Sequence, residues 1–303
     1  MVQGERISIS FSVSDNYAQH LAVVLTSVLV NNPGSNFIFH VLHRNITPAN
    51  ERKVKALEAT YPNCRVAFHK IDASRFDRFQ IPAELEHVTQ ETYYRYILPE
   101  VLADEDRTIY SDVDVLCVGD LRPLWNIDLQ GNLIGAVSEG EAGDFKKRRL
   151  DLEGEAPYFN AGLQVIDLKT MREGGYTAKL MDNTIKYAKL LAWPDQDVIN
   201  ITMRNRILAI DPKWNSVGQS YNPFRRDVVL WHFAGFTQKP WCNIFKNITW
   251  IPYLKYLLKS PYRNAALKFV WGHLKGFFYF TYTKKGVKRV LVCGFRVWKG
   301  RAP

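Results

Sequence analysis

The sequence lacks the features that direct a chain into or across a membrane. No apolar run reaches the roughly 18 residues of a spanning helix, and no basic segment followed by an apolar core opens the chain. We therefore expect a protein that is neither exported nor embedded in a bilayer. Cysteines are few, at positions 64, 117, 242 and 293, without C-x-x-C spacing. This pattern offers no zinc site or disulfide framework, so we expect reduced thiols.

Glycine-rich phosphate loops are also missing. No G-x-G-x-x-G follows the first strand-like run, and no G-x-x-x-x-G-K-[S/T] occurs anywhere. Their absence removes the main support for a dinucleotide-dependent enzyme and for a P-loop nucleotidase.

Acidic residues are absent from the C-terminal tail, residues 242–303. This tail holds thirteen Lys or Arg and fourteen aromatic residues, which leaves 27 basic against 30 acidic side chains in residues 1–241. The formal net charge of +10 therefore belongs to the tail. Nucleic acid is not an expected partner, because the rest of the chain is slightly acidic and carries no nucleic-acid motif. Basic and aromatic residues suit the interface of an anionic membrane. The alternative, a small helical subdomain packed on the body, is compatible with membrane contact.

The remainder alternates β-rich runs with helix-like stretches, which predicts an α/β domain built on a parallel or mixed sheet. We expect strands near 6–13, 36–42, 65–71, 107–118, 132–138 and 161–168. We expect helices near 17–32, 48–60, 89–100 (ended by Pro99), 176–192 and 195–205. The charged stretch 139–157 is expected to be a connecting loop, with a flap over a site as the alternative. The predicted organisation is a domain of residues 1–241 followed by a mainly helical region, 242–303.

Three D-x-D pairs occur: Asp104/Asp106, Asp112/Asp114 and Asp195/Asp197. The first lies in a polar turn, where solvation is free. Asp112 and Asp114 follow the apolar run "TIY", at the carboxyl end of a strand, where open α/β sheets bind ligands. Carboxylates two residues apart on an extended chain share one side and can converge on a hard cation. Two capping or hydrogen-bonded aspartates are the alternative.

A hard cation with few protein ligands completes its shell with phosphate oxygens, which predicts a nucleoside diphosphate. A metal-bridged diphosphate that departs as a stabilised anion fits glycosyl transfer from a nucleotide sugar. Two other classes stay open. A sugar-nucleotide-synthesising enzyme would need a basic glycine-rich loop, unlike "FSVSDNYAQ" after the first strand. A non-catalytic membrane- or polyanion-binding protein would not need the carboxylate pair.

Six segments resemble, in this order, the successive motifs of glycosyltransferase family 8. They are "FSVSDNYAQHLAVVLTSVLVNNP", "TYYRYILPE", "TIYSDVDVLCVGDLRPLW", "YFNAGLQVIDL", "DQDVIN" and "HFAGFTQKPW", within about residues 7–241. Within the family, the chain is most similar to bacterial galactosyl- and glucosyltransferases of lipopolysaccharide synthesis. The resemblance implies a GT-A fold, a UDP-galactose or UDP-glucose donor, Mn²⁺ dependence and retention of anomeric configuration. It also implies a lipopolysaccharide, lipooligosaccharide or other lipid-linked saccharide acceptor, and a cytoplasmic location at the inner face of the plasma membrane.

The resemblance assigns roles to individual residues. Asp112, Asp114 and His232 match the metal site, and an imidazole beside two carboxylates suits Mn²⁺ better than Mg²⁺. Gly235 and Lys239 match positions that approach the diphosphate. The remaining donor-side positions are Ser12, Val13, Ser14, Asn16, Tyr17, Arg95, Val113, Asn160, Ala161 and Gly162. Ser14 stands where the family pattern leads us to expect an Asp against uracil.

Asn160, Asp195 and Gln196 match the sugar and acceptor side, and Asp195 also stands where a helix N-cap is expected. An amide such as that of Gln196 is a poor nucleophile, so we favour same-face attack assisted by the departing phosphate. Removal of residues 243–303 is expected to abolish membrane sedimentation while donor hydrolysis stays measurable.

Overall fold

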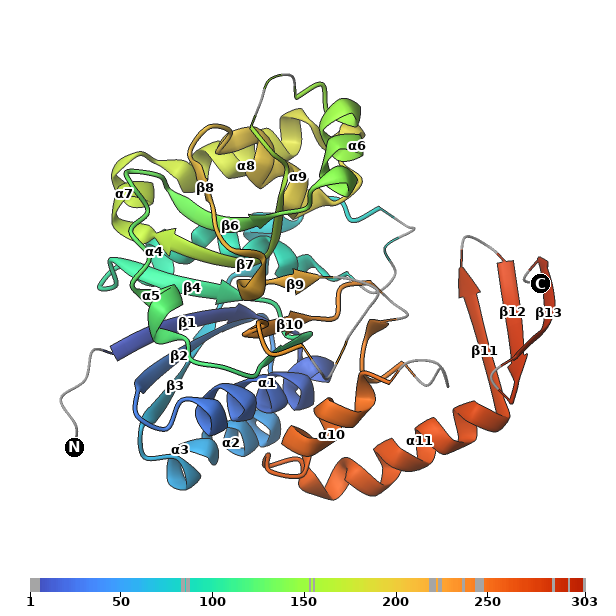
Figure 1. Ribbon diagram of the computed structural model, residues 1–303. Helices are drawn as coiled ribbons and strands as arrows, with labels where there is room; N and C mark the ends of the chain where they lie inside the picture. Colours follow the sequence, from blue (N-terminus) through green and yellow to red (C-terminus); the bar gives the residue numbers. More distant parts are fainter. Residues whose placement is uncertain are drawn as a thin grey trace.

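A seven-stranded mixed sheet forms the centre of the molecule, in the order β3-β2-β1-β4-β7-β6-β8 (Figure 1). The computed structural model describes residues 6–82, 85, 88–152, 154, 156–217, 222, 225–235, 238–242, 248–284, 287–293 and 295–301. The strands of the sheet are β1 (Arg6–Ser12), β2 (Asn36–His43), β3 (Cys64–Lys70), β4 (Arg107–Ser111), β6 (Ile134–Ser138), β7 (Phe159–Asp167) and β8 (Ile207–Ala209).

The strand directions decide where ligand-binding residues can gather. β1, β2, β3 and β4 are parallel, whereas β7 runs antiparallel to both β4 and β6. The edge at which β1, β4 and β6 end is therefore the edge at which β7 begins. Segments near residues 13, 112, 139 and 160 meet there.

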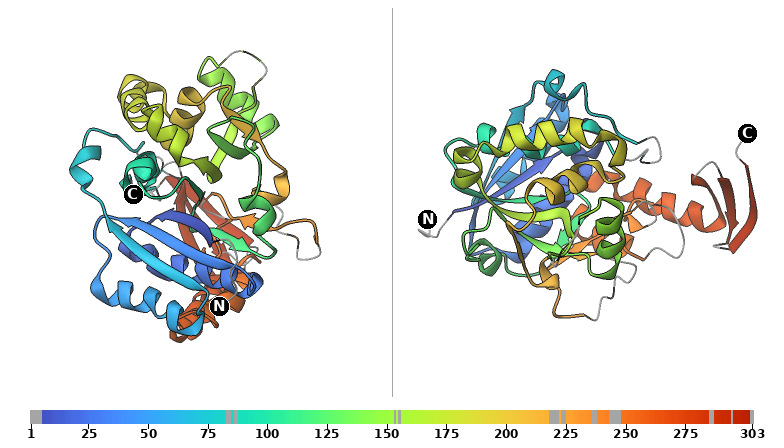
Figure 2. Two further views of the ribbon diagram at one scale, coloured as in Figure 1. Left: turned by 90° about the vertical axis from the view of Figure 1, so that its left-hand side faces the viewer. Right: turned by 90° about the horizontal axis from the view of Figure 1, so that it is seen from above.

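Helices cover both faces of this sheet (Figures 1 and 2). One face carries α1 (Ala18–Asn31), α2 (Pro48–Lys55) and α3 (Leu57–Thr60). The other carries α4 (Leu98–Val101), α7 (Leu168–Glu173), α8 (Tyr176–Lys186) and α9 (Pro194–Thr202). Each face has its own cluster of buried apolar side chains. The predicted core strands and most of the predicted helices are thus confirmed.

The predicted strand 107–118 is two strands in two sheets. The chain leaves the main sheet after Ser111 and enters a three-stranded sheet, ordered β5-β10-β9, at Val115. Its strands are β5 (Val115–Cys117), β9 (Ser216–Val217) and β10 (Leu230–His232). His232 is the register partner of Val115 in the antiparallel β5–β10 pair. This pairing brings a residue from late in the chain against the break between the two strands.

Two other sequence expectations were wrong. The stretch expected to be a loop contains a helix, α6 (Glu141–Arg149). The helix expected over 89–100 is a 3₁₀ helix, η3 (Gln90–Ile97), and Pro99 lies in the first turn of α4 instead of ending a helix. Short elements complete the core: α5 (Arg122–Trp125) and the 3₁₀ turns η1 (Asp15–Tyr17), η2 (Ala73–Phe76), η4 (Ala188–Leu190) and η5 (Pro212–Trp214).

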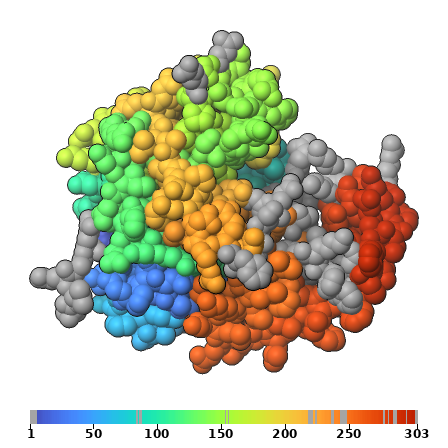
Figure 3. Space-filling model, viewed as in Figure 1, coloured from blue at the N-terminus to red at the C-terminus, as the bar shows by residue number. Residues whose placement is uncertain are grey.

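The C-terminal region begins with helices and ends in a sheet. α10 (Trp250–Leu257), η7 (Arg263–Ala265) and α11 (Ala266–Phe278) confirm the helical prediction for its first part. The antiparallel sheet of β11 (Tyr279–Lys284), β12 (Val287–Val292) and β13 (Phe295–Arg301) was not predicted. This sheet projects from the body at the end of α11 (Figures 1 and 2), and its residues form the right-hand flank of the face in Figure 3.

α10 packs on α1, where Tyr253, Tyr256 and Leu257 join a buried cluster with Val23. The division of the chain between residues 241 and 242 remains a prediction. The four cysteines carry free thiols. None of the helices in the described part of the chain is long and apolar enough to span a bilayer.

Candidate active site

A cavity of about 810 Å³ opens at the sheet edge where β1, β4 and β6 end and β7 begins. This volume falls within the usual range for small-molecule sites, roughly 300–1,000 Å³. Every site residue singled out from the sequence lines it except Asn16: Ser12, Val13, Ser14, Tyr17, Arg95, Asp112, Val113, Asp114, Asn160, Ala161, Gly162, Asp195, Gln196, His232, Gly235 and Lys239.

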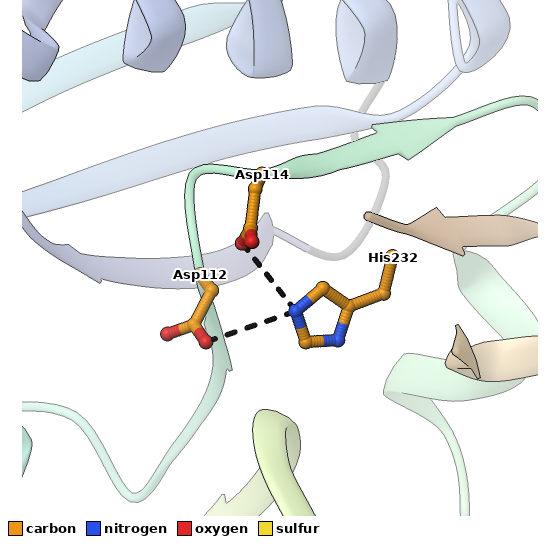
Figure 4. A group of neighbouring side chains, drawn as sticks. All are labelled: Asp112, Asp114 and His232. Atoms are coloured by element: carbon orange, nitrogen blue, oxygen red, sulfur yellow. Dashed lines mark ion pairs between the residues drawn. The ribbon is translucent and has the colours of Figure 1, made fainter. Parts of the chain in front are cut away.

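Two carboxylates and one imidazole that line this cavity point towards one another (Figure 4). Asp112 follows β4, Asp114 precedes β5, and His232 ends β10. The Nε2 atom of His232 lies 3.4 Å from Oδ1 of Asp114 and 3.9 Å from Oδ2 of Asp112. The three side chains are the one group in the described residues whose possible ligand atoms all lie within 4.8 Å of one another.

The orientation of His232 is fixed by a chain of hydrogen bonds that starts from the backbone. The N–H of Gly162 donates to Oδ1 of Asn160 over 2.9 Å, so this atom is the amide oxygen. It also accepts a bond of 2.8 Å from Nδ2 of Asn215. The carbonyl Oδ1 of Asn215 therefore faces Nδ1 of His232, 2.9 Å away. Because Nδ1–H donates there, the Nε2 atom faces the two carboxylates, and a neutral ring would offer its Nε2 lone pair to a metal ion held between them. Burial lowers the pKa of His232, but Asp114 and Asp112 outweigh burial and the pKa is raised.

The donor set fits a divalent cation. Octahedral ligands at about 2.1 Å from an ion lie about 3 Å apart, close to the shorter of the two separations. The backbone also makes room. A Cβ at Gly162 would lie 2.2 Å from Cε1 of His232 and 2.8 Å from Oδ2 of Asp112. Position 162 therefore requires glycine.

The surrounding charges shift the pKa values of Asp114 and Asp112 in opposite directions. Burial raises the pKa of Asp114, but an ion pair with Lys239 and the nearby His232 outweigh burial and hold this pKa well below its usual range. Burial also raises the pKa of Asp112. Arg95 opposes that effect only in part, so the pKa of Asp112 is raised. Burial lowers the pKa of Lys239, yet Asp114 outweighs it and the pKa is raised.

Arg95 is buried and links two carboxylates. Its Nη2 atom lies 2.9 Å from Oδ1 of Asp112 and 3.1 Å from Oδ2 of Asp195. Its Nη1 atom donates to the carbonyl of Ala161 over 2.7 Å, and the guanidinium lies 4.1 Å from the centre of the Tyr110 ring. Asp112 thus turns one oxygen to Arg95 and the other to His232.

Asp195 does not cap α9, contrary to the sequence expectation. The helix begins at Pro194, and Trp193 occupies the cap position without a side-chain bond. The neighbouring Asp197, in the third D-x-D pair, is fully buried and structural. Its carboxylate accepts bonds from the backbone N–H groups of Ala192 and Trp193 and from the hydroxyl of Tyr158.

Gln196 is held on both ends of its amide. The oxygen accepts from the N–H of Ala161 over 3.0 Å, and the nitrogen donates to Glu139 and to the Tyr158 hydroxyl. Glu139 also accepts a bond from Asn160 and pairs with Lys146 of α6, 2.5 Å away.

Sequence reasoning missed several residues of this cavity. Glu139 directly follows a predicted strand, so the rule that singled out Asp112 could have found it. Lys146 lay in the segment taken for a loop, and its ammonium lies 4.1 Å from the centre of the Trp193 ring. For Asn215 the sequence offers no signal, because its role depends on the position of His232.

The loop after β1 forms another part of the cavity wall. The Ser14 hydroxyl donates to Oδ1 of Asn16 over 2.6 Å, and Asn16 itself is exposed. Asp15 does not substitute for the aspartate expected at position 14. Its carboxylate accepts from the N–H of Thr47 and from Nδ2 of Asn50, at the start of α2.

Gly235 and Lys239 approach the pair from the segment after β10. Gly235 has a φ of +88°, a backbone conformation that side chains disfavour. Both residues line the cavity, and their roles towards a diphosphate stay predictions.

The mixed sheet, with an acidic pair at its ligand-binding edge and a histidine beside it, defines a GT-A glycosyltransferase. Residues 8–244 match the model of "Glycosyl transferase family 8". The chain belongs to this family and is a glycosyltransferase.

Individual proteins similar to this chain cover most of its length. General stress protein A of Bacillus subtilis is 26% identical over 88% of this chain and 98% of its own length. Lipopolysaccharide 1,3-galactosyltransferase of Salmonella typhimurium is 27% identical over 87% of this chain and 81% of its own. The galactosyltransferase LgtC, solved with donor and acceptor sugar analogues, is similar in structure with a TM-score of 0.74. It is 27% identical, and the match covers 84% of this chain and 96% of that one.

Proposed function

We propose that this enzyme transfers a hexose, galactose or glucose, from a UDP-sugar to a saccharide of the lipopolysaccharide or lipooligosaccharide core, with retention of configuration. The observation that carries the proposal is the convergence of Asp112, Asp114 and His232 beside Lys239 in one cavity. The similarity to a lipopolysaccharide galactosyltransferase supports the acceptor class.

Asp112, Asp114 and His232 would hold Mn²⁺, with Mg²⁺ as the alternative. The bound ion supplies a Lewis acid for the diphosphate leaving group. Lys239 adds a second positive charge on the same side, and the backbone at Gly235 allows close approach of phosphate oxygens. Ser12, Val13, Ser14 and Tyr17 are proposed to bind uridine, with the Tyr17 ring against the base.

The sugar is proposed to lie between Asn160, Asp195 and Gln196. Two carboxylates of the cavity wall are already engaged in ion pairs, Asp195 with Arg95 and Glu139 with Lys146. The amide of Gln196 is a poor nucleophile and is held by three hydrogen bonds. These contacts support attack by the acceptor on the face from which the diphosphate leaves. A glycosylated residue trapped with a slow donor and found by mass spectrometry would instead establish a covalent route.

The test is a panel of UDP-sugars offered with truncated lipid-linked glycans of the host, with and without Mn²⁺. We expect UDP release that requires the metal and a product one hexose heavier, with the anomeric linkage of the donor. UDP release from no donor in the panel would favour a non-catalytic binding protein. Release that does not depend on a divalent ion would contradict the assigned metal site.

We further propose that the C-terminal region contacts an anionic membrane, the surface that carries such acceptors. α11 exposes Leu267, Trp271, Leu274 and Phe278 at spacings of four, three and four residues, which place them along one face. Lys268 and Lys275 of the same helix are exposed. No acidic residue occurs in residues 242–303 to oppose an anionic surface. We call the four apolar side chains Leu267, Trp271, Leu274 and Phe278 the α11 face.

A further inference from the structure

The residues around Lys239 are held by the C-terminal helices. We call Gln238–Trp241 the Lys239 segment. Thr249, just before α10, donates from its hydroxyl to the carbonyl of Gln238 over 3.0 Å. Nε2 of His273, in α11, lies 2.9 Å from the carbonyl oxygen of Pro240. The backbone on both sides of Lys239 is therefore bonded to the region after residue 242.

Trp241 fixes the end of this segment. Its ring stacks on His20 of α1, with centroids 3.6 Å apart and planes 24° apart. It meets Tyr17 edge-on at 5.8 Å and Tyr253 of α10 at 5.9 Å. The Tyr253 hydroxyl in turn lies 2.7 Å from Nδ1 of His20. One cluster thus joins the cavity residue Tyr17 to α10.

α11 is tied into the same cluster. Phe269 stacks on Tyr253 with centroids 5.0 Å apart, and the carbonyl of Phe269 lies 3.0 Å from Nδ1 of His273. The His273 ring is buried between two carbonyl oxygens, one from its own helix and one from the Lys239 segment. Carbonyl oxygens only accept, and burial lowers the pKa of His273, so the neutral ring carries one N–H and donates to one of the two carbonyls. In the Nε2–H tautomer that carbonyl is the one of Pro240, 2.9 Å away.

We propose that α10 and α11 are part of the donor site, with Thr249, Tyr253 and His273 as positioning residues for Lys239. This inference rests on the proposed function, in which Lys239 binds the diphosphate. Lys239 has a long, flexible side chain, and its ammonium is useful at the cavity only while the backbone beneath it is fixed. The contacts at Gln238, Pro240 and Trp241 fix that backbone from two sides. Removal of residues 243–303 would then disturb the donor site as well as membrane contact, unlike the outcome expected from the sequence.

The test compares His273→Ala with His273→Gln in the full chain, without membranes. Loss of one hydrogen bond worth about 1 kcal/mol corresponds to roughly a fivefold change in affinity. We therefore expect His273→Ala to raise the KM for the UDP-sugar roughly five- to tenfold. It should also speed amide exchange in the Lys239 segment. Glutamine can still donate to the Pro240 carbonyl, so His273→Gln should recover most of both effects.

A second variant, Thr249→Val, tests the same inference if His273→Ala folds poorly. Thr249→Val removes the bond to Gln238 with little change in shape, and should raise the same KM and the same exchange rates. Its matched control is Thr283→Val, at an exposed position in β11. Asn264→Ala, exposed in η7, is the control for His273. Folded His273 and Thr249 variants with unchanged KM and unchanged exchange would overturn the inference.

Lys239→Ala separates this inference from the proposed function. If it leaves the KM for every active UDP-sugar unchanged, the diphosphate role of Lys239 fails, and amide exchange alone decides the positioning role. If Lys239→Ala raises KM but the His273 and Thr249 variants do not, only the positioning role fails.

Discussion

At the scale of single residues, Asp114 joins the proposed metal ligand His232 to Lys239, because it faces His232 with one oxygen and Lys239 with the other. Asp114→Asn keeps the shape but removes the charge. We predict a loss of transfer activity of about 100-fold or more. The substitution removes a proposed metal ligand, and it also removes the charged partner of the buried Lys239 ammonium. Steady-state kinetics over a range of Mn²⁺ concentrations measures the effect.

Asp104 supplies the control, since it belongs to another D-x-D pair but is exposed in a turn. Asp104→Asn should leave activity within twofold. Circular dichroism should show the same secondary structure in both variants. A loss of the helical signal in Asp114→Asn would assign the carboxylate to folding and not to metal binding.

Asn215 affords a finer test, because it touches the imidazole and not the proposed ion. Asn215→Ala removes the acceptor that holds His232 with Nε2 towards the carboxylates. Loss of such an outer partner commonly weakens metal binding by about 10- to 100-fold. We predict that the Mn²⁺ concentration for half-maximal activity rises by that factor. Activity at saturating Mn²⁺ should fall much less. Equal metal dependence in the two proteins would show that Asn215 does not orient His232.

At the scale of elements, local patterns predicted the parallel half of the sheet and the position of the acidic pair. The strand-like run before Asp112 favoured this pair over the other two D-x-D pairs, because a β-rich run that ends in carboxylates has a clear meaning in an α/β sheet. The break of that run into β4 and β5 was not predictable. It depends on β10, more than a hundred residues later, which pairs with β5 in the second sheet.

Two further elements were missed for opposite reasons. α6 carries only two buried residues, Gly143 and Lys146, so no apolar stripe marks it as a helix. Residues 279–301 did carry a signal, since runs rich in aromatic and β-branched residues lie on both sides of "KKG". Such runs around a turn indicate a hairpin, but the high density of aromatic residues was interpreted as helical.

The strand pair β2–β3 predicts a pH dependence of folding. Nδ1 of His40 on β2 lies 3.0 Å from Nε2 of His69 on β3, and burial lowers the pKa of both rings, that of His40 to about 4. His69 and Arg6 lower the pKa of His40 further, and Glu105 lies 3.7 Å from its Nε2 atom. The folded state therefore resists protonation that an unfolded histidine accepts near pH 6.5.

Above pH 6.5 both states are neutral at His40, and stability does not change with pH through this group. Between pH 6.5 and 4 the unfolded state binds the extra proton, so stability falls as pH falls. We predict a loss of about 2 kcal/mol from His40 by pH 5. Urea unfolding of the protein and of His40→Gln from pH 7 to 5 tests this. The variant should lose less stability over that interval, and parallel curves would contradict the assignment.

At the scale of the whole molecule, the boundary drawn by charge is not a boundary in the packing of the chain. The positive excess lies after residue 241, yet α10 of that region packs on α1 and shares a buried cluster with it. The C-terminal region is thus tied to the body on one side and exposes apolar side chains on another. Truncation would remove both properties at once, so the membrane proposal needs changes confined to the exposed side.

The α11 face allows such a change. Trp271 and Leu267 are 67% and 86% exposed, so Trp271→Ser together with Leu267→Ser should leave the fold intact. We predict that this double variant binds anionic phospholipid vesicles at least tenfold more weakly in sedimentation. Binding of the unaltered protein should also weaken with added salt, because about 1 kcal/mol per basic residue near the surface is screened. Phe145→Ser is the control, since Phe145 is 60% exposed on α6, away from the C-terminal region. If the double variant and the unaltered protein sediment alike with anionic vesicles, the α11 face is not the membrane contact. The exposed apolar residues of β13 then become the region to test.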